Sequence, residues 1–275
     1  MTNLNFSVLM SIYVKETPSN LDSCFESLHF QSVQANEIIL VLDGPIGDGL
    51  LTIIDKWSLL LPIEKICLED NVGLGQALNI GLKHCTHELV ARMDTDDIAL
   101  TNRFVQQLSC FSQDSSLSIC GSFISEFDDE PQVSISTRTL PIAHDSIYKG
   151  IAWANPFNHM TVMYRKSHIV SVGGYQDLPW MEDWYLWTRL LAKGYKAYNI
   201  PEVLVLARTG LNMIQRRSGF SYVKSEWLMS KVKVSLKICC WPKALLIFIV
   251  RSLPRFLPKR ILYLVYLCSR KYKHN

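Results

Sequence analysis

Several common signals are missing from this sequence, and each absence excludes a class of protein. It has no run of about 18 uncharged apolar residues, so an ordinary membrane-spanning helix is not expected. The segment from Met1 to Thr17 lacks a basic stretch and a small-residue cleavage site, and we interpret it as containing a first strand rather than a secretory signal. The loop GxxxxGK(S/T) is also absent, which argues against a P-loop nucleotide hydrolase. The eight cysteines form no CxxC pair, so they indicate no zinc or redox motif and favour free thiols in a reducing cytoplasm.

The amino-acid composition is that of a folded protein, and its charges are unevenly distributed along the chain. Hydrophobic residues make up 48% of the chain and charged residues 19%, which excludes a disordered protein. Residues 1–215 contain 14 basic and 24 acidic residues, whereas residues 216–275 contain 14 basic residues and a single acidic one, Glu226. This division predicts a main domain over residues 1–215 and a basic helical tail over residues 216–275 with an anionic partner.

The tail combines aliphatic runs with regularly placed basic and aromatic residues. This is the pattern of a basic amphipathic helix, and we expect it to lie in the plane of an anionic membrane surface. The alternative is a pair of C-terminal helices that packs on the main domain while its charges are solvated. Nucleic acid is not expected as a partner, because the basic residues are mixed with long aliphatic runs and the main domain is acidic.

The first half of the chain alternates strand patterns with helix patterns, which predicts an α/β fold with a mainly parallel sheet covered by helices. In such sheets, ligands bind beyond the carboxyl ends of the strands. Polar residues follow the second, third and fourth strands, as Asp43, Asn71 and the run from Asp94 to Asp97. The expected strands are Phe6 to Ile12, Glu37 to Leu42, Ile63 to Leu68, Leu89 to Met93 and Ile119 to Phe127, with a further one from Thr161 to Tyr164; the expected helices begin at Pro18 and cover Gly49 to Leu61, Leu74 to Cys85 and Asn102 to Phe111.

The run Asp94-Thr95-Asp96-Asp97 directly follows a buried strand. Three carboxylates within four residues repel one another unless a cation is bound, and oxygen ligands of this kind suit a hard divalent ion that also contacts substrate phosphates. The alternative is a solvated acidic turn that caps the next helix. The position of the run after a strand of a parallel sheet favours the metal site.

Two further motifs have both a structural and a functional interpretation. Asn71-Val-Gly73-Leu-Gly75 resembles part of a dinucleotide fingerprint but lacks its third glycine, so we expect only a helix N-terminus able to hold a phosphate or a sugar. Glu182 and Asp183 could merely compensate a helix dipole, or, beside Trp180, could place a carboxylate against a sugar ring as a general base. A lone histidine such as His159 is more often structural than catalytic.

Taken in order along the chain, these motifs resemble the family 2 glycosyltransferases with the GT-A fold, and most closely the bacterial enzymes that build O-antigen and exopolysaccharide chains. The resemblance extends over about residues 5 to 210 and is specific as an ordered set. The matching segments are Phe6 to Tyr13, Ile38 to Gly44, Asn71 to Gly81, Ala91 to Asp97, Asn155 to Lys166, Gly173 to Tyr175 and Glu182 to Trp187. The resemblance implies a GT-A domain with a mainly parallel central sheet flanked by helices, followed by a basic helical appendage.

The family resemblance also implies roles for individual residues. Asp183 would be the general base of an inverting transfer, and Asp96 would ligate Mg²⁺ or Mn²⁺ at the diphosphate of a nucleotide-sugar donor, with a UDP-sugar favoured. The acceptor would be a glycan on a polyprenyl diphosphate, which implies a cytoplasmic protein peripheral to the inner face of the cytoplasmic membrane. Donor-binding residues would be Ser11, Tyr13, Asp43, Asn71, Gly73, Arg92, Asp94 and Asp97, and acceptor-side candidates would be Glu182, His159 and Trp180.

The sequence departs from the family pattern at several places. Leu42 stands where the first of two aspartates is usual, and Leu78 stands where an arginine is usual. We expect Arg92 or Lys15 to supply some of the missing positive charge. Two alternatives stay open: a sugar nucleotidyltransferase, which also uses carboxylates and a divalent ion, and a membrane-associated scaffold with an inactive transferase domain.

Overall fold

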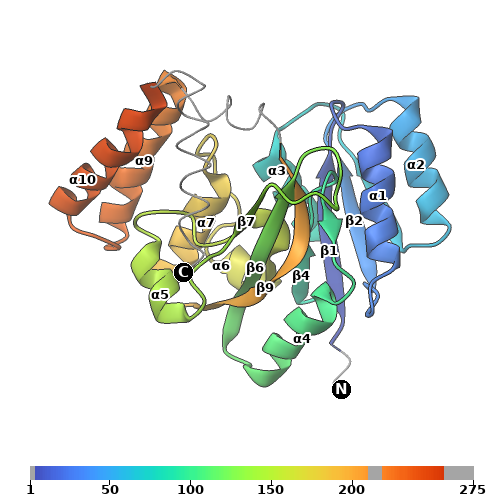
Figure 1. The fold of residues 1–275 in the computed structure, drawn as a ribbon, viewed down its shortest axis with the longest axis horizontal. Coiled ribbons are helices and arrows are strands. Elements are labelled where there is room, and N and C mark those ends of the chain that lie inside the picture. The colour runs from blue at the N-terminus through green and yellow to red at the C-terminus, as the bar shows by residue number, and fades with distance from the viewer. Residues whose placement is uncertain (1–3, 210–218, 257–275) are drawn as a thin grey trace.

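The computed structural model describes residues 4–209 and 219–256, which form a mixed sheet with helices on both faces (Figure 1). Within these residues the sheet has nine strands in the order β3-β2-β1-β4-β8-β6-β9-β5, with β7 paired to β6. The first half of the sheet is parallel throughout and carries the strand ends at which a ligand site is expected. It consists of β1 (Phe6–Ile12), β2 (Glu37–Leu42), β3 (Ile63–Cys67) and β4 (Leu89–Arg92).

Helices α1 (Pro18–His29), α2 (Asp48–Ser58), α3 (Leu74–His84) and α4 (Arg103–Gln113) alternate with these strands, and their bounds differ from the predicted ones by only a few residues. The strand β1 is apolar on both faces because it is covered from both sides. Val8 and Met10 belong to one hydrophobic cluster with α1, α2 and α4, whereas Leu9 belongs to a second cluster with α3. A continuous apolar strand between two helical layers is the pattern that the sequence predicts.

The second half of the sheet is mixed, and the sequence predicts only two of its strands, from Ile119 to Phe127 and from Thr161 to Tyr164. It consists of β5 (Ile98–Ala99), β6 (Leu117–Phe127), β7 (Ser136–Arg138), β8 (Met163–Arg165) and β9 (Lys196–Arg208). The short strand β8 lies between β4 and β6 and is antiparallel to both, while β6 and β9 run parallel.

The strand predicted from Thr161 to Tyr164 is wrong at its start. Thr161 lies in a 3-10 turn, η1 (His159–Thr161), and the strand begins at Met163. The hydroxyl of Thr161 donates to the carbonyl of Asn158 and accepts from the backbone N–H of Ser122. Such side-chain to backbone bonds favour a turn over a strand.

The helices α5 (His144–Gly150), α6 (Lys166–Ser171) and α7 (Glu182–Ala192) pack with α3 on one face of the sheet. Trp187 of α7 is completely buried, with its ring against those of Phe157, Tyr164 and Tyr175. This packing fixes α7, so the two acidic residues in its first turn have a rigid support. The cysteines of the described residues are all free; Cys67 and Cys240 are exposed rather than buried.

Two helices, α9 (Phe220–Ser235) and α10 (Trp241–Ser252), lie side by side at one end of the molecule and are followed by η2 (Leu253–Phe256) (Figure 1). Tyr222 and Met229 of α9 join the hydrophobic cluster of α7, so the pair packs on the main domain. The predicted boundary between residues 215 and 216, and the last part of the predicted tail, lie outside the described residues. Over residues 4–209 and 219–256, no helix is both long and apolar enough to cross a bilayer.

Candidate active site

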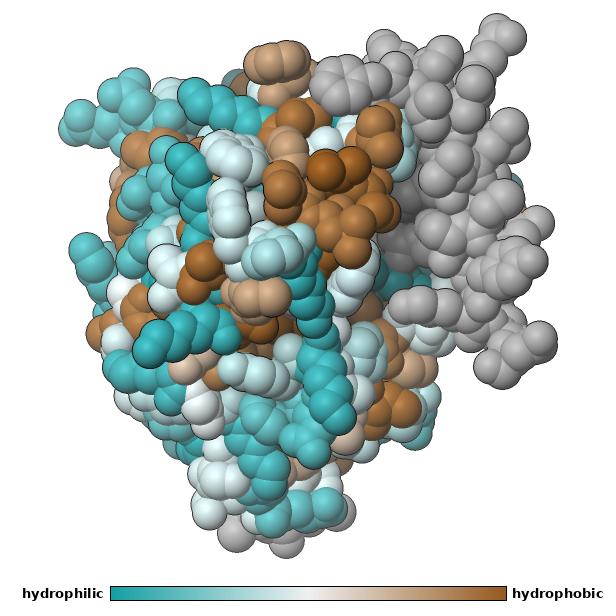
Figure 2. Space-filling model, turned by 90° about the vertical axis from the view of Figure 1, so that its left-hand side faces the viewer, coloured by the Kyte–Doolittle hydropathy of each residue, from teal (hydrophilic) through white to brown (hydrophobic). Residues whose placement is uncertain are grey.

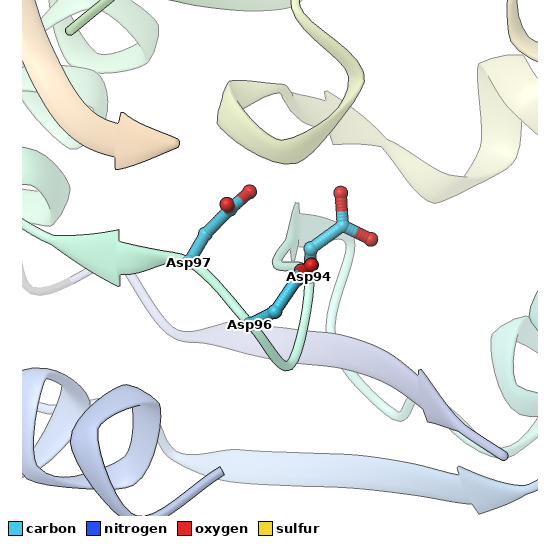
Figure 3. Close-up of side chains that lie close together, drawn as sticks. All are labelled: Asp94, Asp96 and Asp97. Carbon is cyan, nitrogen blue, oxygen red and sulfur yellow. The ribbon is translucent and has the colours of Figure 1, made fainter. Parts of the chain in front are cut away.

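Asp94, Asp96 and Asp97 lie together in the loop between β4 and β5 (Figure 3). One carboxylate oxygen from each of them lies within 4.8 Å of the others. Burial and the charge of Asp94 raise the pKa of Asp96, and burial together with Asp96 raises that of Asp97. Such a set of oxygens loses its mutual repulsion when a divalent cation binds, so these three side chains could hold Mg²⁺ or Mn²⁺.

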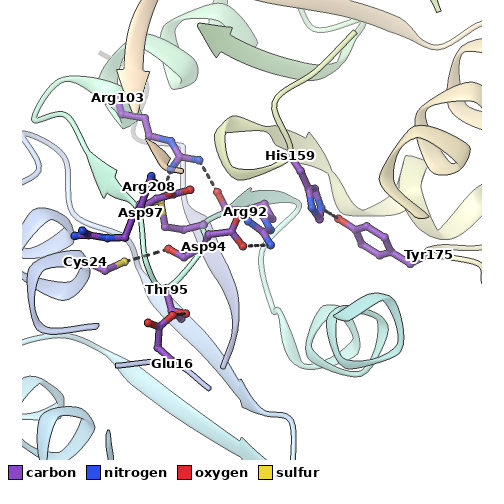
Figure 4. A network of polar contacts seen from close by, with 11 residues as sticks. Glu16, Cys24, Arg92, Asp94, Thr95, Asp97, Arg103, His159, Tyr175 and Arg208 are labelled. Carbon is purple, nitrogen blue, oxygen red and sulfur yellow. Dashed lines mark hydrogen bonds and ion pairs between the residues drawn. The ribbon is translucent and has the colours of Figure 1, made fainter. Parts of the chain in front are cut away.

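Arg92, at the end of β4, lies beside Asp94 (Figure 4). Its side chain is almost completely buried and forms an ion pair with Asp94, and this partner raises the pKa of the guanidinium despite burial. Atoms Nε and Nη1 of Arg92 have no hydrogen-bond partner among the described residues. A buried positive charge with two nitrogen atoms that make no hydrogen bond within the described residues therefore lies beside Asp94.

A second buried arginine, Arg103 of α4, supports the same strand end. Its Nη2 atom donates to the carbonyl of Arg92 at 2.6 Å, and its Nε atom donates to the amide oxygen of Gln107 at 3.2 Å. Burial and the neighbouring charge of Arg92 lower the pKa of Arg103 to about 9. The contact between Arg103 and the strand end could not be predicted from the sequence, because a bond to a backbone carbonyl leaves no motif.

The strand β9 closes the carboxylate loop from the other side. The backbone N–H of Arg208 donates to Asp97 at 2.8 Å, and its Nε atom donates to the carbonyl of Asp96 at 3.3 Å (Figure 4 shows Arg208 beside Asp97). Thr95 is turned away from the two of them and donates to Glu16 at 2.6 Å. Arg208 is a neighbour of this loop that the sequence analysis missed, since nothing local links it to residues 94–97.

Asp43, Asn71 and Gly73 are also brought together. The carboxylate of Asp43 accepts hydrogen bonds from the backbone N–H groups of Val72 at 2.7 Å and Gly73 at 3.1 Å, and from the side-chain amide of Asn71 at 3.0 Å. Gly73 has φ 86°, a backbone conformation that favours glycine, and it caps the start of α3. Asp43 thus fixes the loop after β3 to the loop after β2.

The departures Leu42 and Leu78 have a structural explanation. Leu42 ends β2 with 5% of its surface exposed, and Leu78 of α3 is completely buried in the core. Both positions therefore serve packing and contribute no charge to a ligand site.

Asp183 lies in the first turn of α7 and its carboxylate is held from two sides. Its Oδ2 atom accepts from the side-chain amide of Asn155 at 2.5 Å, and its Oδ1 atom accepts from the backbone N–H of Trp184 at 2.7 Å. Negative charge in a first helical turn is stabilised by the helix dipole. The neighbouring Glu182 has its pKa raised by burial. Asn155 is a further neighbour that the sequence analysis did not single out.

The other two acceptor-side candidates have different environments. The Nε2 atom of His159 lies 2.8 Å from the hydroxyl of Tyr175, and burial and the charge of Arg92 lower the pKa of the imidazole (Figure 4). Trp180, two residues before Glu182, is 47% exposed and has φ 69°, which is unusual for a residue other than glycine. His159 is thus a neutral hydrogen-bonding residue, and Trp180 presents an open ring.

A cavity of about 860 Å³ joins several of these residues. From the main domain it is lined by Arg92, Asp94, His159, Trp180, Glu182 and Asp183, together with Asn155 and Trp153. From the C-terminal helices it is lined by Tyr222, Val250, Arg251, Pro254 and Arg255. The cavity thus contains one residue of the carboxylate loop and the acidic pair of α7. Its lining does not include Ser11, Tyr13, Asp43, Asn71, Gly73, Asp96 or Asp97.

Comparison with known proteins assigns this arrangement to a family. Residues 7–172 match the family model described as Glycosyl transferase family 2. The chain is 41% identical over 266 residues to the amylovoran biosynthesis glycosyltransferase AmsE of Erwinia amylovora, covering 97% of this chain and 99% of that protein. It is 39% identical over 221 residues to the UDP-Gal:alpha-D-GlcNAc-diphosphoundecaprenol beta-1,3-galactosyltransferase of Escherichia coli, covering 80% of each.

Solved structures show the same fold. S. aureus TarS 1-349 in complex with UDP-GlcNAc superposes with a TM-score of 0.67 at 18% identity, over 90% of this chain and 72% of that one. The mannosyltransferase PcManGT from Pyrobaculum calidifontis in complex with GDP-Man and Mn²⁺ superposes with a TM-score of 0.63 at 16% identity, over 99% of this chain and 82% of that one. In the longer S. aureus TarS structure the similar region is 44% of the chain, with a TM-score of 0.65 at 17% identity. These similarities confirm the expected GT-A fold.

Proposed function

The chain belongs to glycosyl transferase family 2, and from this premise we propose that it is an inverting glycosyltransferase that moves a sugar from a nucleoside-diphosphate sugar to a lipid-linked glycan acceptor. The observation that carries the proposal is that Asp94, of the carboxylate loop, and Asp183, of the acidic pair, line one cavity. One carboxylate group is then available for the donor and another for the acceptor.

The donor side consists of the strand ends. Asp94, oriented by its ion pair with Arg92, contacts the ribose or the sugar of the nucleotide sugar. The N–H groups of Arg92 that make no hydrogen bond within the described residues stabilise negative charge on the nucleotide sugar. Asp97 supports this loop or contacts the donor sugar. Asp43 and the loop that it holds, with Asn71 and Gly73, lie at the neighbouring strand ends and bind the nucleoside, together with Ser11 and Tyr13 at the end of β1. A UDP-sugar is favoured because the Escherichia coli relative is named for UDP-Gal.

The carboxylate loop also fits a divalent ion, with Asp96 as a ligand and Asp94 and Asp97 beside it. Burial raises the pKa values of the Asp96 and Asp97 carboxyl groups, as expected for clustered carboxylates without a bound cation. A bound Mg²⁺ or Mn²⁺ ion would stabilise negative charge on the leaving diphosphate. The Mn²⁺ in the complex of the structurally similar mannosyltransferase supports this proposal.

Asp183 acts as the general base in a direct displacement. The acceptor hydroxyl oxygen forms a bond to the anomeric carbon while the bond from that carbon to the diphosphate breaks, and the hydroxyl proton passes to Asp183. The hydrogen bonds from Asn155 and from the backbone of Trp184 hold the carboxylate in one orientation. A single carboxylate suffices because no covalent glycosyl-enzyme is formed, so the configuration at the anomeric carbon is inverted.

Glu182, His159 and Trp180 line the same cavity as Asp183 and are proposed to contact the acceptor. An exposed tryptophan ring offers a flat apolar surface on which a sugar ring can stack. The Escherichia coli relative is named for a diphosphoundecaprenol acceptor, which supports a polyprenyl-diphosphate glycan. We therefore propose that the protein acts in bacterial surface polysaccharide synthesis, peripherally on the inner face of the cytoplasmic membrane.

The proposal is tested by incubating the protein with a set of nucleotide sugars, Mn²⁺ and lipid-linked acceptors, and by measuring the release of nucleoside diphosphate with formation of the extended glycan lipid. Release that depends on both donor and acceptor is expected. Formation of pyrophosphate from a nucleoside triphosphate and a sugar phosphate would instead identify a nucleotidyltransferase. No turnover with any donor, together with no binding of nucleotide sugars, would identify an inactive scaffold.

A further inference from the structure

The outer side of α10 carries a continuous apolar stripe. Its members recur at the spacing of one helix face and are between 40% and 64% exposed. We call this set the outer stripe: Trp241, Leu245, Leu246, Ile249, Val250 and Leu253. Figure 2 views the molecule from the side on which α10 lies in Figure 1 and shows hydrophobic residues gathered on that face. An exposed apolar surface of this kind marks a contact with a partner or a membrane.

The exposed charged side chains of the segment that carries the outer stripe have one sign. In residues 219–256 the exposed charged side chains are all lysines: Lys224, Lys231, Lys237 and Lys243. The single acidic residue there, Glu226, is 1% exposed and is ion-paired with Arg251. An apolar face on a segment whose exposed charges are all positive fits an anionic lipid surface. It does not fit a second copy of the same face, because lysines would then oppose lysines.

The outer stripe is continuous with the cavity that contains Asp183. Val250 belongs to the stripe and also lines the cavity. Arg255, which follows α10 in η2, lines the cavity too, and its guanidinium lies 4.5 Å from the ring centre of Tyr222. Val250, Arg255 and the acidic pair of α7 therefore all line one cavity.

We propose that α10 and η2 bind the lipid-linked acceptor in an extended arrangement, with the outer stripe in the surface of an anionic bilayer, Arg255 at the diphosphate and the terminal sugar at Asp183. The inference rests on the proposed function and specifies how the same cavity recognises its acceptor. The cavity and the stripe that meets it at Val250 thus offer an apolar, a cationic and an acidic surface, which suit the lipid, the diphosphate and the terminal sugar of such a molecule. The C-terminal helices are then part of the acceptor site, and the lipid stays in the membrane during transfer.

The membrane contact is tested by co-sedimentation of the full chain with vesicles of phosphatidylglycerol and phosphatidylethanolamine. The double variant Leu246→Glu/Ile249→Glu is expected to bind at least about tenfold more weakly, because two charges replace inserted apolar groups. Leu59→Glu is the matched control, since Leu59 is 85% exposed at the end of α2 and far from the stripe in sequence. Equal binding of the double variant and the unaltered protein, or an equal loss in Leu59→Glu, would overturn the assignment. So would a dimer in solution that the double variant alone disrupts.

The diphosphate contact is tested with two acceptors that carry the same sugar, one on a lipid diphosphate and one on a short uncharged alkyl chain. Arg255→Gln is expected to raise KM for the diphosphate acceptor about tenfold, the effect of one lost charge-assisted contact, and to leave KM for the uncharged acceptor unchanged. Lys149→Gln, which removes an exposed positive charge on α5 outside the cavity lining, should change neither value. An equal rise for both acceptors would show a structural role and overturn the assignment.

The two proposals fail in different ways. Transfer to the short acceptor that is unaffected by stripe variants supports the glycosyltransferase even when vesicle binding is absent. Vesicle binding by the stripe without transfer to either acceptor would instead count against the proposed function.

Discussion

Arg251 of α10 forms a bidentate ion pair with Glu226 of α9, with three nitrogen–oxygen distances between 2.7 and 3.0 Å. The same guanidinium donates to the carbonyl of Trp153 at 2.9 Å and lies 4.7 Å from the ring centre of Trp184. Since Trp184 follows Asp183 in the chain, one arginine connects both C-terminal helices to the start of α7. Glu226, the only acidic residue of residues 216–275, is thus buried in an ion pair.

Replacing Arg251 by methionine is expected to destabilise the protein by about 3–5 kcal/mol, because Glu226 is left buried without its partner. Urea unfolding of the variant and the unaltered protein measures the difference. The double variant Arg251→Met/Glu226→Gln should recover much of the loss, since it removes the buried charge as well. A loss below about 1 kcal/mol in Arg251→Met would mean that the ion pair contributes no more than an exposed one.

Replacing Asp183 by asparagine is expected to lower kcat by a factor of about 10² to 10⁴ while leaving donor binding intact, because an amide cannot accept the hydroxyl proton. Nucleoside diphosphate release measures kcat, and calorimetric titration with the nucleotide sugar measures donor binding. Asp177→Asn is the control, since Asp177 is an exposed acid close by in sequence and not part of the cavity lining. Unchanged kcat in Asp183→Asn would remove this residue from the role of base.

Replacing Asp96 by alanine is expected to abolish the increase in melting temperature that Mn²⁺ and a nucleotide sugar produce together in the unaltered protein. The reason is the loss of one oxygen from the set of three that lies within 4.8 Å. Thermal unfolding with and without EDTA measures the effect. Asp129→Ala, which removes an exposed acid after β6, should respond to Mn²⁺ like the unaltered protein.

Because Lys233 is buried, we expect the free energy of unfolding to depend on pH. It is completely buried, its Nζ atom has no hydrogen-bond partner among the described residues, and it lies 4.0 Å from the ring centre of Trp184. Burial and the charge of Arg251 lower its pKa to about 7, whereas a lysine in the unfolded chain titrates near 10.4. Between these values the unfolded state binds more protons, so the contribution of Lys233 to stability rises with pH and is least favourable below about pH 7.

Lys233→Met is therefore expected to raise the free energy of unfolding most at pH 6 and least at pH 9. Urea midpoints at several pH values, compared with those of the unaltered protein, measure this difference. Lys231→Met, an exposed neighbour on the same helix, should leave the pH profile as it is. A difference between Lys233→Met and the unaltered protein that is the same at every pH would contradict the assigned titration.

The parallel half of the sheet could be predicted because β1 and β2 are buried on both faces and each is followed by a helix with a clear apolar stripe. The residues near Asp94 could be located for the same reason, since strand ends in a parallel sheet share one edge. In the second half of the sheet, the sequence predicts β6 and the position of β8 but not β5, β7 or β9; β5 and β7 have only two and three residues and are defined by pairing with other strands.

Within the site, side chains that act through distant backbone groups escaped the sequence analysis. Arg208 reaches Asp97 only because β9 pairs with β5, and Asn155 reaches Asp183 through a loop that no local pattern describes. The charge pattern of the C-terminal segment indicated that it is basic. It did not indicate that Arg251 and Arg255 turn inward and line the cavity with Asp183.

The bond between Arg208 and Asp97 also affects the timing of folding during synthesis. The strands β1 to β4 are complete when residue 92 has left the ribosome, but the partner that closes the carboxylate loop is 111 residues further along the chain than Asp97. Contacts of such long sequence separation form late, because the chain between them must first be ordered. The nascent chain can therefore order the parallel half of the sheet before the carboxylate loop is closed, and a chain that ends before β9 contains the three aspartates without the hydrogen bonds from Arg208 to Asp96 and Asp97.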